Sequence, residues 1–181
     1  MKNWFVCLSG LMLLALASCK KNSTSPNSKK GTYNITISGD INKTLKGDVA
    51  LYGTDTSPDG TMFAVGIGAT DVSMNNTSPS ASNYLFIGRN GSKPGTGTYK
   101  FMNVDGSGSE GFIATGSVND NIPYYSVSGT LDINESSSST VGGDFTIQAM
   151  GFQQNGSSID TLHITVKGTF NAVQAPSGPS Q

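Results

Sequence analysis

The chain has 181 residues, 23 of them glycine, and a formal net charge of −1. All twelve acidic residues but only six of the eleven basic ones lie between residues 32 and 173, so this segment has a net charge of −6. Such an acidic segment lacks the basic patches that neutralise phosphates, which argues against nucleic acid as a partner. Its roughly 140 residues suffice for one domain with its own core, and the abundant glycine disfavours helices.

Residues 1–18 have the organisation of an export signal. Lys2 precedes an apolar stretch, Trp4–Ala17, that is shorter than the roughly 20 residues needed to span the hydrocarbon core of a membrane. The stretch ends in Leu-Ala-Ser-Cys at Leu16–Cys19. This run resembles a bacterial lipoprotein signal, in which leucine and two small residues precede an invariant cysteine. A secretory signal with a coincidental cysteine is the alternative.

The lipoprotein resemblance implies a modification at Cys19. This residue then becomes the first of the mature chain and carries a diacylglyceryl thioether and, usually, an amide-linked acyl chain. Two or three acyl chains hold a protein firmly on a bilayer, whereas one gives only marginal binding. The other cysteine, Cys7, and the only tryptophan, Trp4, leave with the signal. The mature chain then has no free thiol and no disulfide, so the core alone must stabilise the domain.

Two terminal segments offer little to bury. After Cys19, the segment 19–31 contains no aliphatic or aromatic side chain, and residues 174–181 are similarly polar. We expect both segments to be disordered, the first as a tether and the second as a tail. The four lysines of the tether either add attraction to anionic head groups, about 1 kcal/mol each, or simply keep a linker soluble.

Three segments in the C-terminal half alternate apolar and polar residues with a period of two. In each segment the apolar side chains share one parity, and mainly polar side chains fill the other. This alternation predicts antiparallel strands with one buried face and one face in water. The apolar sets are Tyr125, Val127, Leu131 and Ile133; Phe145, Ile147 and Ala149; and Leu162, Ile164, Val166 and Phe170.

Six earlier segments predict further strands. Turn-forming runs such as Ser57–Gly60 separate them, and no window of ten residues after the signal shows helical spacing. Met62–Ile67 and Tyr84–Ile87 are apolar on both parities, which indicates central strands or strands partly covered by loops. About nine strands in residues 32–173 predict an all-β fold, an antiparallel β-sandwich or jelly-roll-like domain. The six segments are Tyr33–Ser38, Asp48–Tyr52, Met62–Ala69, Tyr84–Gly88, Thr98–Met102 and Gly111–Val118.

A second resemblance rests on turn and strand residues of the C-terminal half. They lie in Gly97–Tyr99, Ser128–Ile133, Val141–Thr146 and Ile164–Asn171. This part of the chain is similar to a group of uncharacterised lipoproteins, mainly from Bacteroidetes-type bacteria, that carry a domain of unknown function. The resemblance implies a β-sandwich lipoprotein and no particular activity.

No group of residues has the pattern of a catalytic site. Gly106–Gly111 matches the spaced glycines of a dinucleotide-binding loop, but a strand follows instead of a helix, and Asp105 and Glu110 would repel phosphate. A hairpin turn explains this run. His163, the only histidine, falls on the polar parity of a strand and has no second histidine or cysteine with which to bind zinc. The sequence therefore predicts a non-enzymatic protein with no cofactor and no metal site.

Four residues are candidates for contacts or modification. Tyr124 falls on the polar parity of its strand and is predicted to be the best exposed aromatic side chain. Asp105 and Glu110 flank a glycine-serine turn and are predicted to face a ligand, with a calcium ion as one alternative. Asp-Thr-Leu at 160–162 resembles an acceptor triplet for O-glycosylation in Bacteroidetes, with Thr161 as the acceptor.

These observations favour an envelope lipoprotein with a structural or protein-interaction role. Its expected partners are the lipid bilayer, through acylated Cys19, and an envelope protein or glycan. A carbohydrate-binding β-sandwich is the alternative, since six tyrosines offer rings for sugars. By analogy with Gram-negative lipoproteins, Lys20 in place of the inner-membrane aspartate favours the outer membrane. The lack of an acidic cluster after Cys19 favours a domain that faces the periplasm over one exposed at the cell surface.

Overall fold

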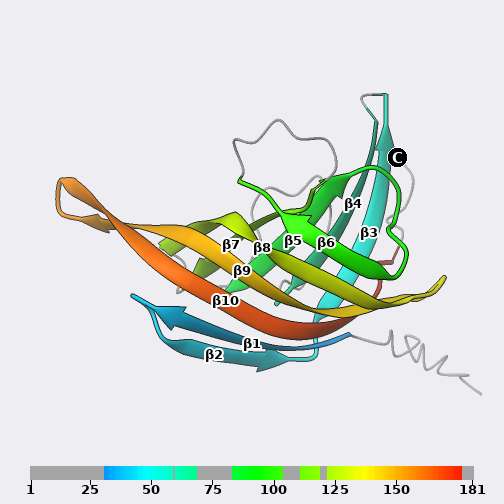
Figure 1. Cartoon of the computed structure of the whole chain (residues 1–181), viewed down its shortest axis with the longest axis horizontal. Coiled ribbons are helices and arrows are strands. Elements are labelled where there is room, and N and C mark those ends of the chain that lie inside the picture. The colour runs from blue at the N-terminus through cyan, green and yellow to red at the C-terminus, as the bar shows by residue number, and fades with distance from the viewer. Residues whose placement is uncertain (1–30, 59, 69–82, 104–110, 119–121, 177–181) are drawn as a thin grey trace, which may run out of the picture.

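The computed structural model of the chain describes residues 31–58, 60–68, 83–103, 111–118 and 122–176. Within these ranges all regular secondary structure is β-strand (Figure 1). None of the described residues forms a helix that is long and apolar enough to cross a membrane. The predicted signal, residues 1–18, and Cys19 lie outside the described residues.

The described residues form ten strands, which fall into two classes by length. Three have 15, 16 and 17 residues, and the other seven have between five and eight. The strands are β1 (Thr32–Gly39), β2 (Lys43–Gly47), β3 (Ala50–Ser57), β4 (Gly60–Ile67), β5 (Tyr84–Asn90), β6 (Gly97–Phe101), β7 (Ile113–Val118), β8 (Ile122–Ser136), β9 (Thr140–Asn155) and β10 (Ser158–Gln174).

The ten strands form one continuous sheet that folds into two layers (Figure 1). One layer has the order β2-β1-β10-β9-β8-β6, and the other has the order β3-β4-β5-β7. The layers join where β8 pairs with β7 and where Val173 and Gln174 of β10 pair with β3. Every strand pair except β10–β3 is antiparallel. The predicted all-β, antiparallel, sandwich-like fold is therefore confirmed, with ten strands instead of about nine.

Strand β2 is the one that the sequence pattern does not predict. It contains a single apolar residue with a large side chain, Leu45, so a period of two cannot be recognised in it. Leu45 lies opposite Ile35 of β1 and packs, half-buried, against the core. Pairing with β1 therefore creates this strand. Lys43 and Lys46 mark it as a short, charged edge of the kind that resists further pairing.

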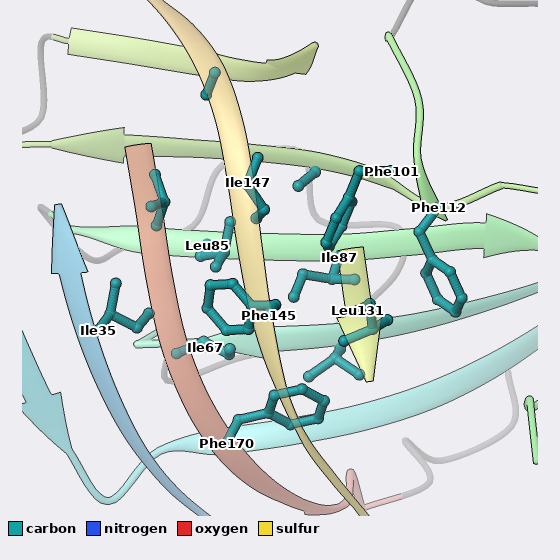
Figure 2. Close-up of a cluster of buried hydrophobic side chains, with 14 of the residues drawn as sticks. Ile35, Ile67, Leu85, Ile87, Phe101, Phe112, Leu131, Phe145, Ile147 and Phe170 are labelled. Carbon is teal, nitrogen blue, oxygen red and sulfur yellow. The ribbon is translucent and has the colours of Figure 1, made fainter. Parts of the chain in front are cut away.

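The core lies between the two layers and contains the apolar sets predicted for β9 and β10 (Figure 2). Phe145 and Phe170 come from these adjacent strands, and their ring centroids are 6.3 Å apart. A Cβ atom at Gly168 would lie 2.8 Å from Cζ of Phe145. The absence of a side chain at this glycine therefore leaves space for the ring of Phe145.

A β-bulge interrupts the pairing of β8 with β9. The register shifts between Ser126 and Ser128, so Val127 has no residue opposite it in β9. The bulge lies where β8 changes its other neighbour, because β7 pairs with β8 up to Tyr125 and β6 pairs with it from Gly129 onward. One extra residue at such a point reverses which face of the strand is buried.

The bulge overturns part of the predicted alternation in β8. Leu131 and Ile133 are buried, as expected, but Tyr125 and Val127 are 38% and 37% exposed. The prediction that all four side chains share the buried face is wrong. It treats the strand as regular, whereas the side chains before the bulge have the opposite parity from those after it.

Ser126 fills the gap that the change of neighbours leaves. Its side chain is fully buried, and its Oγ donates a hydrogen bond to the carbonyl oxygen of Met102 at 2.7 Å. The same Oγ accepts a hydrogen bond from the backbone N–H of Ala114 at 2.9 Å. Since buried backbone groups need partners, this serine pairs the Met102 carbonyl and the Ala114 N–H next to the short backbone bridge between Phe101 and Phe112.

Candidate binding face

The outer face of β8, β9 and β10 changes character at the bulge. The register places Tyr125 opposite Met150 of β9, and Met150 opposite His163 of β10. In the next row, Gln148 of β9 lies opposite Thr165 of β10. The Oγ1 of Thr165 donates a hydrogen bond to Oε1 of Gln148 at 3.0 Å. These two rows and the bulge form a surface that points away from the core.

Four apolar side chains make up a contiguous surface at this point, which we call the outer patch: Tyr125, Val127, Met150 and Phe152. Tyr125 and Val127 are among the most exposed large apolar residues of the described chain. The rings of Tyr125 and Phe152 lie 6.1 Å apart between centroids and are tilted by 53°. Contiguous apolar surface rimmed by polar residues is typical of an interaction site.

A hollow of about 230 Å³ lies beside Val127 and Met150 of the outer patch and extends toward β10. It is smaller than the roughly 300–1,000 Å³ of small-molecule and cofactor sites. The hollow is therefore better matched to one side chain of a partner than to a cofactor. Its lining comes from Val127, Gln148, Ala149, Met150, His163, Ile164 and Thr165.

His163 contributes to the lining of this hollow, and two hydrogen bonds with Asp40 fix the position of its backbone. The side chain is exposed, as the sequence pattern predicts. Its backbone N–H donates to Oδ2 of Asp40 at 2.7 Å, and its carbonyl oxygen accepts from the N–H of Asp40 at 3.1 Å. The described part of the chain contains no group of three histidine, cysteine, aspartate or glutamate side chains arranged to hold a metal.

Tyr124 does not face a ligand, so the prediction of an exposed ring is wrong. Its side chain is only 2% exposed and points into the core, because the bulge reverses the parity of this part of β8. A Cβ atom at Gly116 would lie 2.2 Å from its Cζ, so the glycine provides the space for the ring. The hydroxyl group donates to the carbonyl oxygen of Tyr84 at 3.3 Å. Burial, with a smaller contribution from Tyr84, raises the pKa of Tyr124.

Of the other candidate residues, only Thr161 belongs to the part of the chain that the structure describes. Thr161 is exposed on β10, opposite Phe152, and lies inside a strand instead of at its start. Asp105 and Glu110 fall between residues 104 and 110, outside the described residues, as does Cys19. The ligand-facing and lipidation predictions for these three residues therefore stay predictions.

A second aromatic cluster closes the opposite end of the sandwich and has a structural explanation. The guanidinium of Arg89 lies 5.8 Å from the ring centroid of Tyr99 and 5.6 Å from that of Phe112. Nearby, Nζ of Lys93 lies 5.3 Å from the ring centroid of Tyr52 and donates to a backbone carbonyl group. These cations cover rings that belong to the core. Near this cluster Met62 and Ile113 are 37% and 36% exposed, but the cluster's own rings are covered.

The residues of the outer patch were missed by sequence reasoning for an identifiable reason. Tyr125 and Val127 continue the apolar parity of Leu131, so they were assigned to the core. The one local sign of a break is Gly129, which leaves the apolar parity without a side chain between Val127 and Leu131. Glycine within a strand often marks a bulge, but it does not say on which side of it the faces reverse.

Comparisons of the chain with protein-family models, with curated proteins and with solved structures find no match. The resemblance of the C-terminal half to uncharacterised lipoproteins therefore stays a prediction. The outer patch has to be interpreted through its own chemistry.

Proposed function

We propose that this chain is a membrane-anchored envelope lipoprotein whose domain binds another protein through the outer patch. The observation that carries the proposal is the exposure of Tyr125 and Val127, next to Met150 and Phe152, on the face of a sheet that is otherwise polar. Tyrosine, phenylalanine and methionine are enriched in protein interfaces. The proposed role is structural or connecting, and it is non-enzymatic.

Anchoring is the sequence-based part of the proposal. The motif ending at Cys19 supports acylation, and Lys20 supports the outer membrane, with the domain facing the periplasm. In bacteria fed labelled palmitate, the full chain should become labelled and sediment with membranes. Cys19→Ala should lose the label and appear in the soluble fraction, with an unchanged β-rich circular dichroism spectrum. Membrane retention of unlabelled Cys19→Ala would contradict this proposal.

Interaction through the outer patch calls for a test that compares two positions of one strand. A photoreactive amino acid placed at Val127 in the full chain should give a discrete cross-linked protein adduct in cells. The same amino acid at Thr130, which lies on the polar part of the outer face of β8, is the matched control and should give none. Equal cross-linking at the two positions, or none at Val127, would remove the support for a protein-binding patch.

Carbohydrate binding is a second candidate because two aromatic side chains, Tyr125 and Phe152, lie together on this face. Their 53° tilt gives no single flat platform for a sugar ring, and aliphatic and thioether groups surround them. Protein binding therefore ranks first. Saturation-transfer NMR with a panel of envelope glycans distinguishes the two functions. Sugar signals that vanish in Tyr125→Ser would favour the carbohydrate function.

A further inference from the structure

A two-stranded hairpin extends beyond the rest of the domain. The last pair between β8 and β9 in this direction joins Tyr124 to Gly151, and the last pair between β1 and β10 joins Gly39 to Ile164. Beyond these pairs, residues 152–162 form only pairs between β9 and β10 among the described strands. We call these residues the arm. Figure 1 shows it projecting past the other strands.

One edge of the arm presents unpaired backbone groups. His163 directs its N–H and C=O toward the side of β1, where Asp40 bonds both. Alternate residues of a strand direct these groups to the same edge, so Thr161 and Ile159 direct theirs to this side as well. No described strand lies beside them. The arm therefore offers two residues with free donors and acceptors in strand geometry.

This edge lacks the features that usually block strand addition. Edge strands are commonly protected by lysine, proline or a bulge, and β2 at the margin of the same layer carries two lysines. The arm has neither lysine nor proline, and its Ile159 is 69% exposed. An isolated two-stranded hairpin is marginally stable. A third strand would satisfy the free groups and cover this apolar side chain.

The charges at this edge indicate which strand it accepts. From Gln148 to Thr165 the only carboxylate is that of Asp160, and no lysine or arginine occurs. Asp40 lies at the inner end of the free edge, so two carboxylates bracket Thr161. A second copy of this chain in matching register would bring carboxylates together, which is unfavourable across paired strands. A strand that carries lysine or arginine matches this pattern.

The position of the arm also bears on its occupant. Thr32, where the domain meets the tether, pairs with Asn171, thirteen positions along β10 from Ser158. At about 3.3 Å per residue this distance is roughly 40 Å. Figure 1 shows the start of β1 and the arm at opposite ends of the layer. With the anchor at the tether end, the arm is presented away from the membrane, toward a soluble partner.

We infer that the arm binds an extended, basic segment of another protein as an added β-strand along Ser158–Leu162. The inference rests on the proposed function, because it specifies how a protein partner is bound beside the outer patch. Main-chain hydrogen bonds from Ile159 and Thr161 hold the added strand, and lysine or arginine side chains pair with Asp40 and Asp160. This mode of binding uses the edge of the sheet, whereas the outer patch uses its face.

The test uses a synthetic hexapeptide, Lys-Val-Thr-Val-Lys-Val, and a counterpart with glutamate in place of lysine. All core residues of the described chain lie between Ile35 and Ala172, so the chain from Lys20 to Gln181 keeps the complete core. In this chain, the basic peptide should slow hydrogen exchange of the amides of Ile159 and Thr161, as seen by NMR. The acidic peptide should not.

A pair of substitutions at one position isolates the strand edge. Thr161→Pro removes an N–H that points to the free edge, so the ladder with β9 is preserved, and proline is tolerated at such positions. It should weaken binding of the basic peptide by about tenfold or more. Thr161→Val keeps the N–H and should bind as the unsubstituted chain does. Equal binding by the two variants would overturn the inference.

Other outcomes separate this inference from the proposed function. If neither peptide changes the hydrogen-exchange rates of the Ile159 and Thr161 amides, or if both change them equally, the inference that the arm binds a basic strand is overturned. If the basic peptide changes NMR chemical shifts only at Tyr125 and Val127, strand addition is overturned, but a protein-binding outer patch remains supported. Sedimentation equilibrium that shows a dimer dissociated by Thr161→Pro would assign the edge to a second copy instead. The proposed function itself depends on the comparison of cross-linking at Val127 and Thr130.

Discussion

Two halves of the outer face of β8, β9 and β10 belong to the same strands but differ in chemistry. On one side of the bulge lies the outer patch. On the other side, Thr130 lies opposite Thr146, which lies opposite Lys167, and the next row pairs Asp132 with Asp144. Both halves cover equally well-buried core residues. The polar half demonstrates that the fold needs no apolar side chains on this face, so those of the outer patch require another explanation.

The largest effect is expected when the hydrogen bonds that support the bulge between the two halves are removed. Ser126→Ala leaves the Met102 carbonyl and the Ala114 N–H buried without a partner. We expect the free energy of unfolding to fall by about 1–3 kcal/mol, as measured by urea denaturation. Ser128→Ala, at an exposed position two residues away, is the control and should change stability by less than about 0.5 kcal/mol. Equal effects would show that Ser126 does not support the bulge.

The next prediction uses the pH dependence of the free energy of unfolding to test whether Tyr124, which lies before the bulge, faces the core. Tyr124 has a higher pKa in the folded state than the usual value of 10.0 because it is buried. The folded chain therefore holds this proton more tightly, which stabilises it below pH 10, and the stabilisation is lost as the pH rises above 10. The loss from Tyr124 amounts to at most about 1.4 kcal/mol per pH unit.

Tyr124→Phe removes this proton, so its free energy of unfolding should fall less steeply above pH 10 than that of the unsubstituted chain. Urea denaturation at several pH values between about 9 and 11 measures both slopes. At pH 7 the variant should lose only about 0.5–1.5 kcal/mol, from the missing hydrogen bond to Tyr84. Identical slopes would mean that the ring of Tyr124 is accessible to water.

A third prediction exchanges the chemistry of the two halves. Replacing Tyr125 by serine and Val127 by threonine should lower the free energy of unfolding by about 1–2 kcal/mol at most, because these half-exposed side chains lose only their cross-strand contacts with Met150 and Phe152. The double variant should elute earlier from a hydrophobic-interaction column. The converse variant, with valine at Thr130 and Thr146, should elute later than the unsubstituted chain. A large loss of stability in the first variant would return the outer patch to a purely structural role.

The smallest expected effect concerns the polar half. Asp132 and Asp144 lie directly opposite each other in β8 and β9, and like charges in this arrangement are unfavourable. Asp144→Asn should raise the free energy of unfolding by about 0.2–1 kcal/mol at low ionic strength. The gain should shrink in high salt, where exposed charges are screened. Asp160→Asn, which has no opposing carboxylate in the β9–β10 register, serves as the control.

The amino-acid sequence by itself determined the fold class and most of the strands. In β9 and β10 the alternation of Phe145 and Ile147, and of Ile164 and Val166, follows from a local rule, since every second residue of a strand faces the same way. Turn residues between these runs are equally local signals. A period of two and the positions of turns are therefore sufficient to predict an antiparallel all-β domain.

Only the tertiary structure decided which faces and edges remain open. The orientation of Tyr124 and Tyr125 depends on a bulge, and the bulge depends on the distant groups of Met102 and Ala114 that Ser126 bonds. The free edge at Thr161 likewise depends on where β1 ends, at Gly39, directly before Asp40. These contacts join residues far apart in the chain, and alternation within one strand carries no information about them. Most of the strands could be predicted from the sequence, whereas β2, the outer patch and the arm could not.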